Sequence, residues 1–252
     1  HGVSVRQQMG TVLAMHVDPD SLRRAVDALG AIELESHELS PVLSDAAASI
    51  TELMSATGTG VMLADEGAVP RYVSATDEAA RLLEQVQEQQ GVGPCIDCVV
   101  VNELVVSGDL ALDQRWPTVS EVVVPAGVRS IVGAPVLLGG APVGSLNIYD
   151  AAPRDWDESD LHAARTLARS FSALLEQALR TLRGDQPVEQ LQYALDNRVV
   201  IERAVGYLMA SLGVDTVEAF NRLRRRARDD RAAVAEIAAR LLADRTHPPT
   251  GW

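Results

Sequence analysis

The fold class is set by residues 130–149, which read SIVGAPVLLGGAPVGSLNIY. Two apolar runs, Ser130 to Leu138 and Val143 to Tyr149, flank the glycine pair at 139–140. Glycine adopts the positive φ angles that a tight hairpin turn requires, so this stretch predicts two antiparallel strands joined by a short turn. An antiparallel sheet is therefore expected in this half of the chain.

The residues before the hairpin combine helical and β-rich patterns. Helices are predicted at 40–54 and at 77–90, the second with Asp77 as its N-cap, and short strands at 60–64 and 71–75. Mixed elements around an antiparallel hairpin are typical of the α+β class. We therefore expect an antiparallel sheet with flanking helices, followed by a helical connector and a bundle of three helices.

A helical apolar seam follows Trp156. Its residues recur in steps of three and four, the spacing of a coiled coil or of a packed helix face. They are Leu161, Ala164, Ala168, Phe171, Leu175, Ala178 and Leu182. Such a seam can pair with a second chain or pack inside its own domain. We expect a connector at 161–183 that joins two chains as a coiled-coil homodimer.

A domain boundary is predicted at residues 184–187, where Gly, Asp, Gln and Pro combine a helix end with a new helix start. A second seam then runs from Leu191 to Leu212. Asp215, with Glu218 three positions later, resembles a capping box for the next helix, and Asp229 or Asp230 is a candidate cap for a third. The expected organisation is a segment at 1–38, a sensor domain at 39–160, the connector, a helical domain at 184–245 and a tail at 246–252.

The net charge of −13 is unevenly distributed. Residues 1–183 hold 12 arginines against 25 acidic residues, whereas residues 184–252 hold 10 of each. Arginines crowd the predicted second helix of the bundle at Arg222, Arg224, Arg225, Arg226, Arg228 and Arg231. Guanidinium groups can contact phosphates and stack on unpaired bases, so this helix is a candidate contact for nucleic acid.

A simpler interpretation of these arginines also exists. Asp229, Asp230 and Glu218 lie within reach on the same helix, so the cluster can be a solvated face that pairs with its own acids. Arg198, within the second seam, can bridge to Glu202 or to a partner helix. If the cluster binds RNA, the strongest candidates are Arg224, Arg225 and Arg228, followed by Arg198 and Arg203.

Residues 191–241 resemble the ANTAR family of transcription antitermination regulators. The matching residues are Ala194-Leu195, Arg198, Ile201, Ala204, Gly206, Leu208-Met209, Ala219-Phe220, Leu223-Arg224, Ala227 and Ile237-Ala238. The resemblance implies a three-helix domain that binds paired hairpins in nascent messenger RNA, usually as a dimer. One residue departs from the family, which commonly has Lys before the glycine of its first helix, where this chain has Val205.

The first part of the chain resembles a GAF domain. The matching motifs are Gly91-Val92-Gly93-Pro94-Cys95, Asp109-Leu110, Arg115-Trp116-Pro117, Arg129-Ser130, Val143 to Asn147 and Asp157 to Leu161. GAF domains often hold a small ligand against one face of the sheet, so the resemblance implies a small-molecule ligand. The cyclic-nucleotide-binding members carry a signature that includes Lys, which this chain lacks altogether, so the ligand is unnamed.

Cys95 and Cys98 form a CxxC motif that could be a redox pair or half of a metal site. The histidines are scattered and a second ligand pair is missing, so we expect two ordinary thiols, no metal site, no cofactor and no catalytic residues. Apolar runs are too short to cross a membrane and no signal peptide is recognised, which favours a cytoplasmic protein.

These patterns together predict a signal-responsive antitermination regulator that binds RNA hairpins under the control of a GAF-type sensor. Two alternatives from other classes stay open. The first is a thiol enzyme that uses Cys95 and Cys98, and the second is a protein-interaction module without RNA binding.

Overall fold

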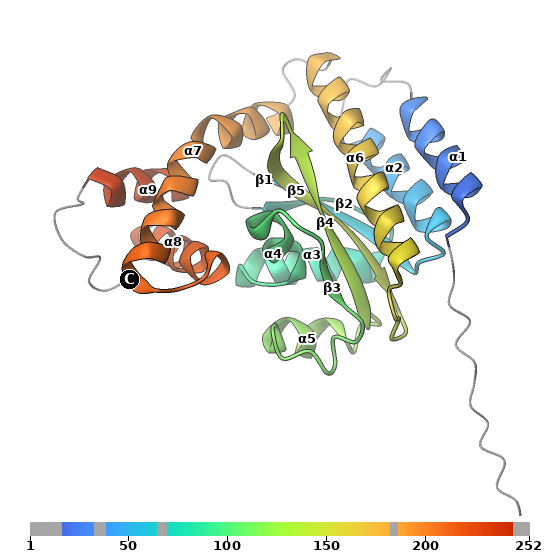
Figure 1. Cartoon of the computed structure of the whole chain (residues 1–252), viewed down its shortest axis with the longest axis horizontal. Helices are drawn as coiled ribbons and strands as arrows, with labels where there is room; N and C mark the ends of the chain where they lie inside the picture. The colour runs from blue at the N-terminus through green and yellow to red at the C-terminus, as the bar shows by residue number, and fades with distance from the viewer. Residues whose placement is uncertain (1–16, 33–38, 65–69, 182–185, 244–252) are drawn as a thin grey trace, which may run out of the picture.

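The computed structural model describes residues 17–32, 39–64, 70–181 and 186–243 and, of residues 70–72 and 186–196, the backbone alone. Its elements are, in chain order, α1 (Pro19–Gly30), α2 (Leu39–Leu53), β1 (Gly58–Ala64), β2 (Pro70–Ala75), α3 (Glu78–Gln90), α4 (Pro94–Val101), β3 (Val105–Ser107), α5 (Pro117–Val123), β4 (Ser130–Leu138), β5 (Ala141–Asp150), α6 (Glu158–Thr181), α7 (Gln186–Leu212), α8 (Thr216–Asp230) and α9 (Val234–Ala243). Figure 1 shows their arrangement.

Within the described residues the sheet has five strands in the order β2-β1-β5-β4-β3, and every neighbouring pair is antiparallel. The hairpin predicted at 130–149 is confirmed as β4 and β5. Gly139 and Gly140 take φ angles of 56° and 82°, the left-handed conformation that the turn needs. Strand β5 begins at Ala141 rather than Val143, because Ala141 pairs with Leu138 directly across the turn.

Helices cover both faces of the sheet (Figure 1). On one face α1, α2 and α6 enclose a core that includes Leu146 and Ile148 of β5. On the other, α3, α4 and α5 enclose a core that includes Tyr149 of the same strand. Side chains alternate between the two faces of a strand, so β5 contributes to both cores. The predicted α+β class and the antiparallel sheet with flanking helices are confirmed.

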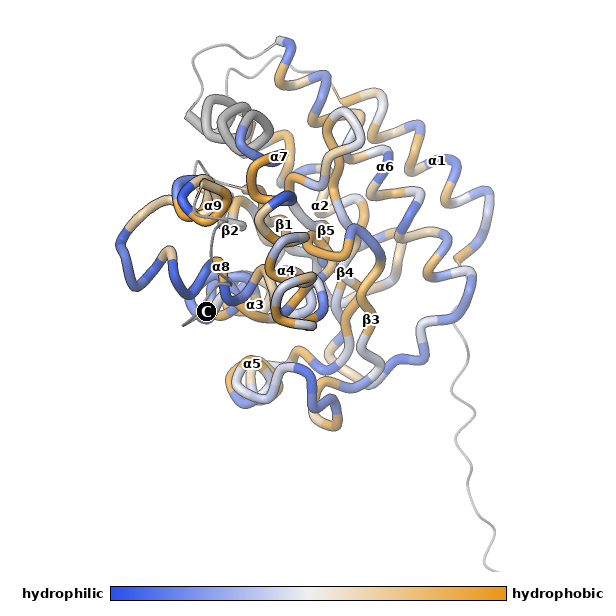
Figure 2. The backbone as a smooth tube through the Cα atoms, turned by 60° about the vertical axis from the view of Figure 1, so that its left-hand side comes forward, coloured by the Kyte–Doolittle hydropathy of each residue, from blue (hydrophilic) through white to orange (hydrophobic). Residues whose placement is uncertain are grey.

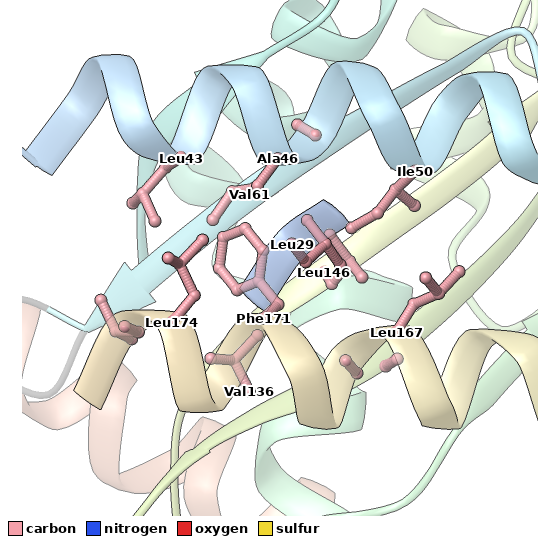
Figure 3. Close-up of a cluster of buried hydrophobic side chains, with 14 of the residues drawn as sticks. Leu29, Leu43, Ala46, Ile50, Val61, Val136, Leu146, Leu167, Phe171 and Leu174 are labelled. Atoms are coloured by element: carbon pink, nitrogen blue, oxygen red, sulfur yellow. The ribbon is translucent and has the colours of Figure 1, made fainter. Parts of the chain in front are cut away.

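The seam of α6 packs inside the chain. Figure 3 shows Leu167, Phe171 and Leu174 of α6 directed toward Leu43 and Ile50 of α2. Of the seven predicted seam residues, Ala164, Ala168, Phe171, Leu175 and Ala178 are at most 3% exposed, Leu161 packs against the same core, and Leu182 lies outside the described residues. The expected coiled coil through this face is therefore corrected, because the apolar face that would meet a second chain is filled by α1, α2 and β4.

Helix α1 lies in the segment 1–38, for which no element was predicted. Asp18 caps its first turn by accepting a hydrogen bond from the Ser21 amide at 2.9 Å. Leu29 is fully buried in the core that contains α6. The segment therefore contributes part of the cover over α6.

Helices α7, α8 and α9 form the predicted bundle around Ile201, Leu208, Phe220, Leu223 and Ile237. Asp215 caps α8 as expected and accepts a hydrogen bond from the Glu218 amide at 2.8 Å. The cap predicted for the third helix is wrong, because Asp229 and Asp230 are the last residues of α8, which Arg231 caps with a left-handed φ of 51°. Leu191 and Ala194 of the predicted seam have side chains outside the described part.

Candidate functional site: the arginine helix at the domain contact

Helix α8 lies against α4 of the first domain, and Val100 of α4 packs into the core of the bundle. Figure 2 shows hydrophilic residues along α8, in contrast to the mainly hydrophobic strands of the sheet. The arginines of α8 consequently fall into different environments, which depend on the direction in which each side chain leaves the helix.

Arg224 is buried at the contact between the two domains. The residue is only 5% exposed, and its Nη1 donates a hydrogen bond of 2.6 Å to the carbonyl oxygen of Gly91. The guanidinium lies 5.8 Å from the centroid of the Phe220 ring. Gly91 ends α3 with a φ of 71°, and a Cβ atom at this residue would lie 3.0 Å from Nη2 of Arg224. A glycine at this position therefore provides both the turn and the space for the guanidinium.

Arg228 reaches the same end of α3. It is exposed, and its Nη1 donates a hydrogen bond of 3.3 Å to the carbonyl oxygen of Gln90. The last turn of α3 contains no basic residue of its own. Because the carboxyl end of a helix carries a partial negative charge, Arg224 and Arg228 supply from α8 the cations that this end favours.

The remaining candidates are divided between paired and open arginines. Arg198 pairs with Glu202 at 2.6 Å, as the simpler interpretation proposed. Arg203 and Arg225 are exposed, and among the residues that the structure describes neither forms an ion pair. The five predicted RNA contacts therefore do not share one environment: Arg224 and Arg228 meet at the end of α3, Arg198 is paired, and Arg203 and Arg225 face solvent.

Neighbouring arginines on α8 also pair within their own helix. Arg222 contacts Glu218 at 2.6 Å and Arg226 contacts Asp230 at 3.2 Å, both with a spacing of four residues. Pairs of this kind stabilise a surface helix only modestly. Glu218 and Asp230 thus engage arginines of α8 that were not ranked as candidates.

The two cysteines are enclosed between α3, α4 and the sheet. Both are fully buried and free, with Cys95 Sγ accepting a hydrogen bond of 2.7 Å from Gln87 Nε2 and Cys98 Sγ donating one of 3.2 Å to the Cys95 carbonyl. Burial, followed by the neighbouring Glu84, raises the pKa of each thiol well above its ordinary value. The thiolate, which is the reactive form, is therefore disfavoured. No group of three side chains able to hold a metal ion occurs in the described ranges.

A buried polar cluster beside the cysteines was not predicted. Glu84 Oε1 accepts a hydrogen bond of 2.8 Å from Asn147 Nδ2, which also donates to Ser145 Oγ at 3.0 Å. Glu84 Oε2 and Asn147 Oδ1 are buried with no hydrogen-bond partner among the described residues. Burial raises the pKa of Glu84 to about 8, so at neutral pH the protonated acid predominates.

The space for Glu84 is provided by the sheet. A Cβ atom on Gly60 of β1 would lie only 2.1 Å from Glu84 Oε1, so this strand position must lack a side chain. The sequence contained a sign of this cluster, because Glu84 falls between Ala80 and Gln87 on the buried side of α3, where a carboxylate is unusual. Asn147 similarly interrupts the apolar alternation of β5.

Two family models match the sequence. The GAF domain model matches residues 38–175, and the ANTAR domain model matches residues 189–242. The GAF match includes most of α6, which the sequence pattern had assigned to a separate connector beginning at 161. A search of curated proteins finds no match.

Solved structures support the fold of the first domain. The GAF domain of a phosphoenolpyruvate-protein phosphotransferase from Acinetobacter superposes with a TM-score of 0.51 at 17% identity, covering 66% of this chain and 96% of that one. The corresponding GAF domain from Coxiella burnetii superposes with a TM-score of 0.50 at 17% identity, covering 64% of this chain and 94% of that one.

No helix in the described part of the chain is both long and apolar enough to cross a bilayer.

Proposed function

Since this chain belongs to the GAF family and carries an ANTAR domain after its GAF domain, we propose that it is a signal-responsive antitermination regulator that binds RNA hairpins. The combination of a sensor-type domain with an ANTAR domain is regulatory. RNA contact is assigned to Arg198, Arg203, Arg224, Arg225 and Arg228 of the ANTAR domain. A hairpin bound there would keep a terminator from forming in the nascent transcript, a role that belongs in the cytoplasm with the transcripts.

The observation that carries this proposal is the position of the arginines at the contact between the domains. Arg225 and Arg203 are open to solvent, whereas Arg224 and Arg228 are hydrogen-bonded to carbonyl groups of the GAF domain. The acidic GAF domain repels phosphates and the ANTAR domain does not, so RNA is directed to one end of the molecule. The GAF domain thus controls two of the five proposed contacts.

Control by a signal follows from this contact. A change at the GAF domain that separates α8 from the end of α3 would release two guanidinium groups for phosphate contact. The resemblance to GAF domains supports a small-molecule ligand as the signal. The resemblance to the ANTAR family supports a homodimer, which would form through a surface other than the buried seam of α6.

The alternative of a thiol enzyme receives little support from the geometry. Cys95 and Cys98 are fully buried, and the pKa of each thiol is raised by burial and by Glu84. Replacing both cysteines with Ser should therefore leave RNA binding intact. Thiol-dependent turnover of a substrate, absent from the double variant, would favour the enzyme over the regulator.

The proposal is tested by capturing RNA on the purified full-length chain and sequencing what is retained. Enrichment of hairpin-forming segments is expected, with their affinity falling as salt rises, because phosphate contacts release counterions. The experiment is done with and without extracts that contain small metabolites. If neither condition enriches hairpin-forming RNA, the result would instead favour a protein-interaction module.

A further inference from the structure

A cavity of about 300 Å³ lies between the GAF and ANTAR domains, and of the five residues proposed to contact RNA only Arg198 lines it. The GAF domain contributes the end of α4, the end of β1 and the start of β5, and the ANTAR domain contributes one side of α7 and the start of α8. The main apolar residues of its wall are Val99, Val100, Val143, Ile201, Val205 and Phe220. Its volume is at the lower end of the range of small-molecule sites.

This cavity is separate from the place where the GAF resemblance implies a ligand. The sheet face beneath α3 and α4 is filled by the cluster of Glu84, Asn147 and the two cysteines. The cavity instead lies beyond α4, where Val100 also packs against the core of the ANTAR bundle. An occupant of this cavity therefore touches both domains at once.

The polar groups of the wall define the charge of an occupant. Arg198 and Glu202 are both part of the wall and pair with each other at 2.6 Å, so their charges compensate. An anionic ligand would have to compete with Glu202 for Arg198 and would therefore gain little from this cation, while the apolar part of the wall offers it no other. Asn102 and Thr216 provide neutral polar groups, while Phe220 and Met209 favour contact with an aromatic ring.

Two adjacent residues of α7, Val205 and Gly206, line the cavity without a polar side chain. Val205 occupies the position at which ANTAR domains commonly have Lys, and a lysine there would bring an ammonium group to the apolar wall. Gly206 is next to it, and a Cβ atom built on Gly206 would meet nothing within 4 Å. Gly206 is exposed and also lines the cavity, so a larger side chain at this position can be accommodated by the fold.

We propose that this interdomain cavity is a binding site for a small, uncharged, mainly aromatic molecule that carries one hydrogen-bonding group. The ring lies between the apolar residues of α4 and α7, and the polar group faces Asn102 or Thr216. Because both domains form the walls, the bound molecule stabilises the arrangement in which α8 contacts α3. Binding itself does not depend on whether the protein binds RNA.

The test uses the full chain and two probes of similar shape, neutral 2-naphthol and anionic 2-naphthoate. Binding of each probe is measured by fluorescence titration and by calorimetry. We expect 2-naphthol to bind with a dissociation constant on the order of 100 µM, which is reasonable for a molecule of this size. The naphthoate should bind at least about tenfold more weakly, because a carboxylate loses its hydration without gaining a free cation.

Because Gly206 lines the cavity, a leucine side chain in Gly206→Leu should narrow it and weaken 2-naphthol binding by roughly tenfold. Gly206→Ala is the matched variant, since it also raises helix propensity but adds only a methyl group, and it should retain most of the affinity.

Val205→Lys places a charge in the apolar wall and should abolish binding of 2-naphthol. Val199→Lys, the same change at an exposed position of α7, should not.

Circular dichroism measures the helix content and the unfolding temperature of each variant and so identifies any loss of fold. No saturable binding of 2-naphthol below about 1 mM, a range that even weak fragments reach, would overturn the proposal. Binding that Gly206→Leu and Val205→Lys leave unchanged would overturn it equally, because the molecule would then bind elsewhere. Failure of RNA capture would leave this result unaffected.

Discussion

Glu84 is a carboxyl group held between α3 and the sheet, with one hydrogen bond from Asn147 and a second oxygen that has no partner among the described residues. Water would solvate the ionised form far better than this site does. Burial therefore raises the pKa of Glu84 from 4.5 to about 8. The folded protein retains a proton over a pH range in which the unfolded chain releases it.

This difference makes stability depend on pH. Between about pH 4.5 and pH 8 the folded state binds more protons than the unfolded state, so the free energy of unfolding falls as pH rises through this window. The contribution is complete below pH 4.5 and is lost above pH 8. The expected slope for one group is up to about 1.4 kcal/mol per pH unit.

Glu84→Gln should remove this slope, because glutamine resembles the protonated acid and does not titrate. The measurement is urea unfolding of both proteins at a series of pH values, and the difference between them cancels the titration of other groups. A difference in unfolding free energy that stays constant from pH 5 to pH 8 would mean that Glu84 titrates normally.

Among the elements, α6 shows what periodicity can and cannot predict. The spacing of three and four correctly identified the buried side of the helix, because any packed helix face has this period. It could not identify the partner, since a neighbouring helix in the same chain and a second chain demand the same apolar pattern. The partner proved to be the core that contains Leu43 and Ile50 of α2, together with α1, a helix for which no pattern was recognised.

Phe171→Asp is therefore expected to unfold the GAF domain. A charge placed at the fully buried Phe171 should lower the free energy of unfolding by roughly 3 to 5 kcal/mol. Thermal unfolding followed by near-ultraviolet circular dichroism would detect the loss. If the variant were a stably folded monomer while the parent is a dimer, α6 would belong to a subunit interface after all.

The hairpin and the cap of α8 were predicted well because their signals are local. Gly139 and Gly140 need no knowledge of the rest of the fold to form a turn, and Asp215 caps the helix that follows it directly. The contact of Arg224 with Gly91 joins residues 133 positions apart, and the Glu84 cluster joins α3 to β5. No local pattern encodes such encounters, so the arginine helix was recognised but the burial of Arg224 was not.

Within α7 and α8, the solvent-facing arginines should contribute to RNA binding without any rearrangement. Replacing Arg203 or Arg225 with Ala should weaken hairpin binding, because each guanidinium neutralises phosphate charge. Each substitution that removes one phosphate interaction should also reduce the dependence of log K on log salt by roughly 0.7 to 0.9. Titrations of hairpin RNA at several salt concentrations measure both effects.

Arg23→Ala provides the matched control for these variants. Arg23 is an exposed arginine of α1 that pairs with Asp20, so its replacement changes the total charge equally but lies outside the ANTAR domain, on the helix that packs against the GAF domain. An equal loss of affinity for Arg23→Ala and Arg225→Ala would show that only net charge matters, which would remove Arg225 from the proposed contact.

At the scale of the whole molecule, the contact between the domains links the sensor to the proposed RNA site. The hydrogen bonds from Arg224 and Arg228 to the end of α3 are available only while α8 lies against the GAF domain. If Arg224 and Arg228 contact RNA as proposed, RNA and the GAF domain compete for the same two guanidinium groups. Any change that weakens the contact should strengthen RNA binding, because less free energy is then needed to release these groups.

The most direct test of this account is the affinity of hairpin RNA for Gly91→Val, measured beside the parent chain and beside Gly127→Val. Both glycines have positive φ, at 71° and 96°, so valine strains the backbone at both positions. Only a valine side chain at 91 would displace the Arg224 guanidinium, because nothing lies within 4 Å of a Cβ at 127. Breaking a charged hydrogen bond of this kind should raise the affinity of Gly91→Val for RNA by roughly tenfold. Gly127→Val should bind as the parent does. An affinity that Gly91→Val leaves unchanged, with the fold intact, would contradict control by the GAF domain, and the absence of hairpin binding in all three proteins would contradict RNA binding itself.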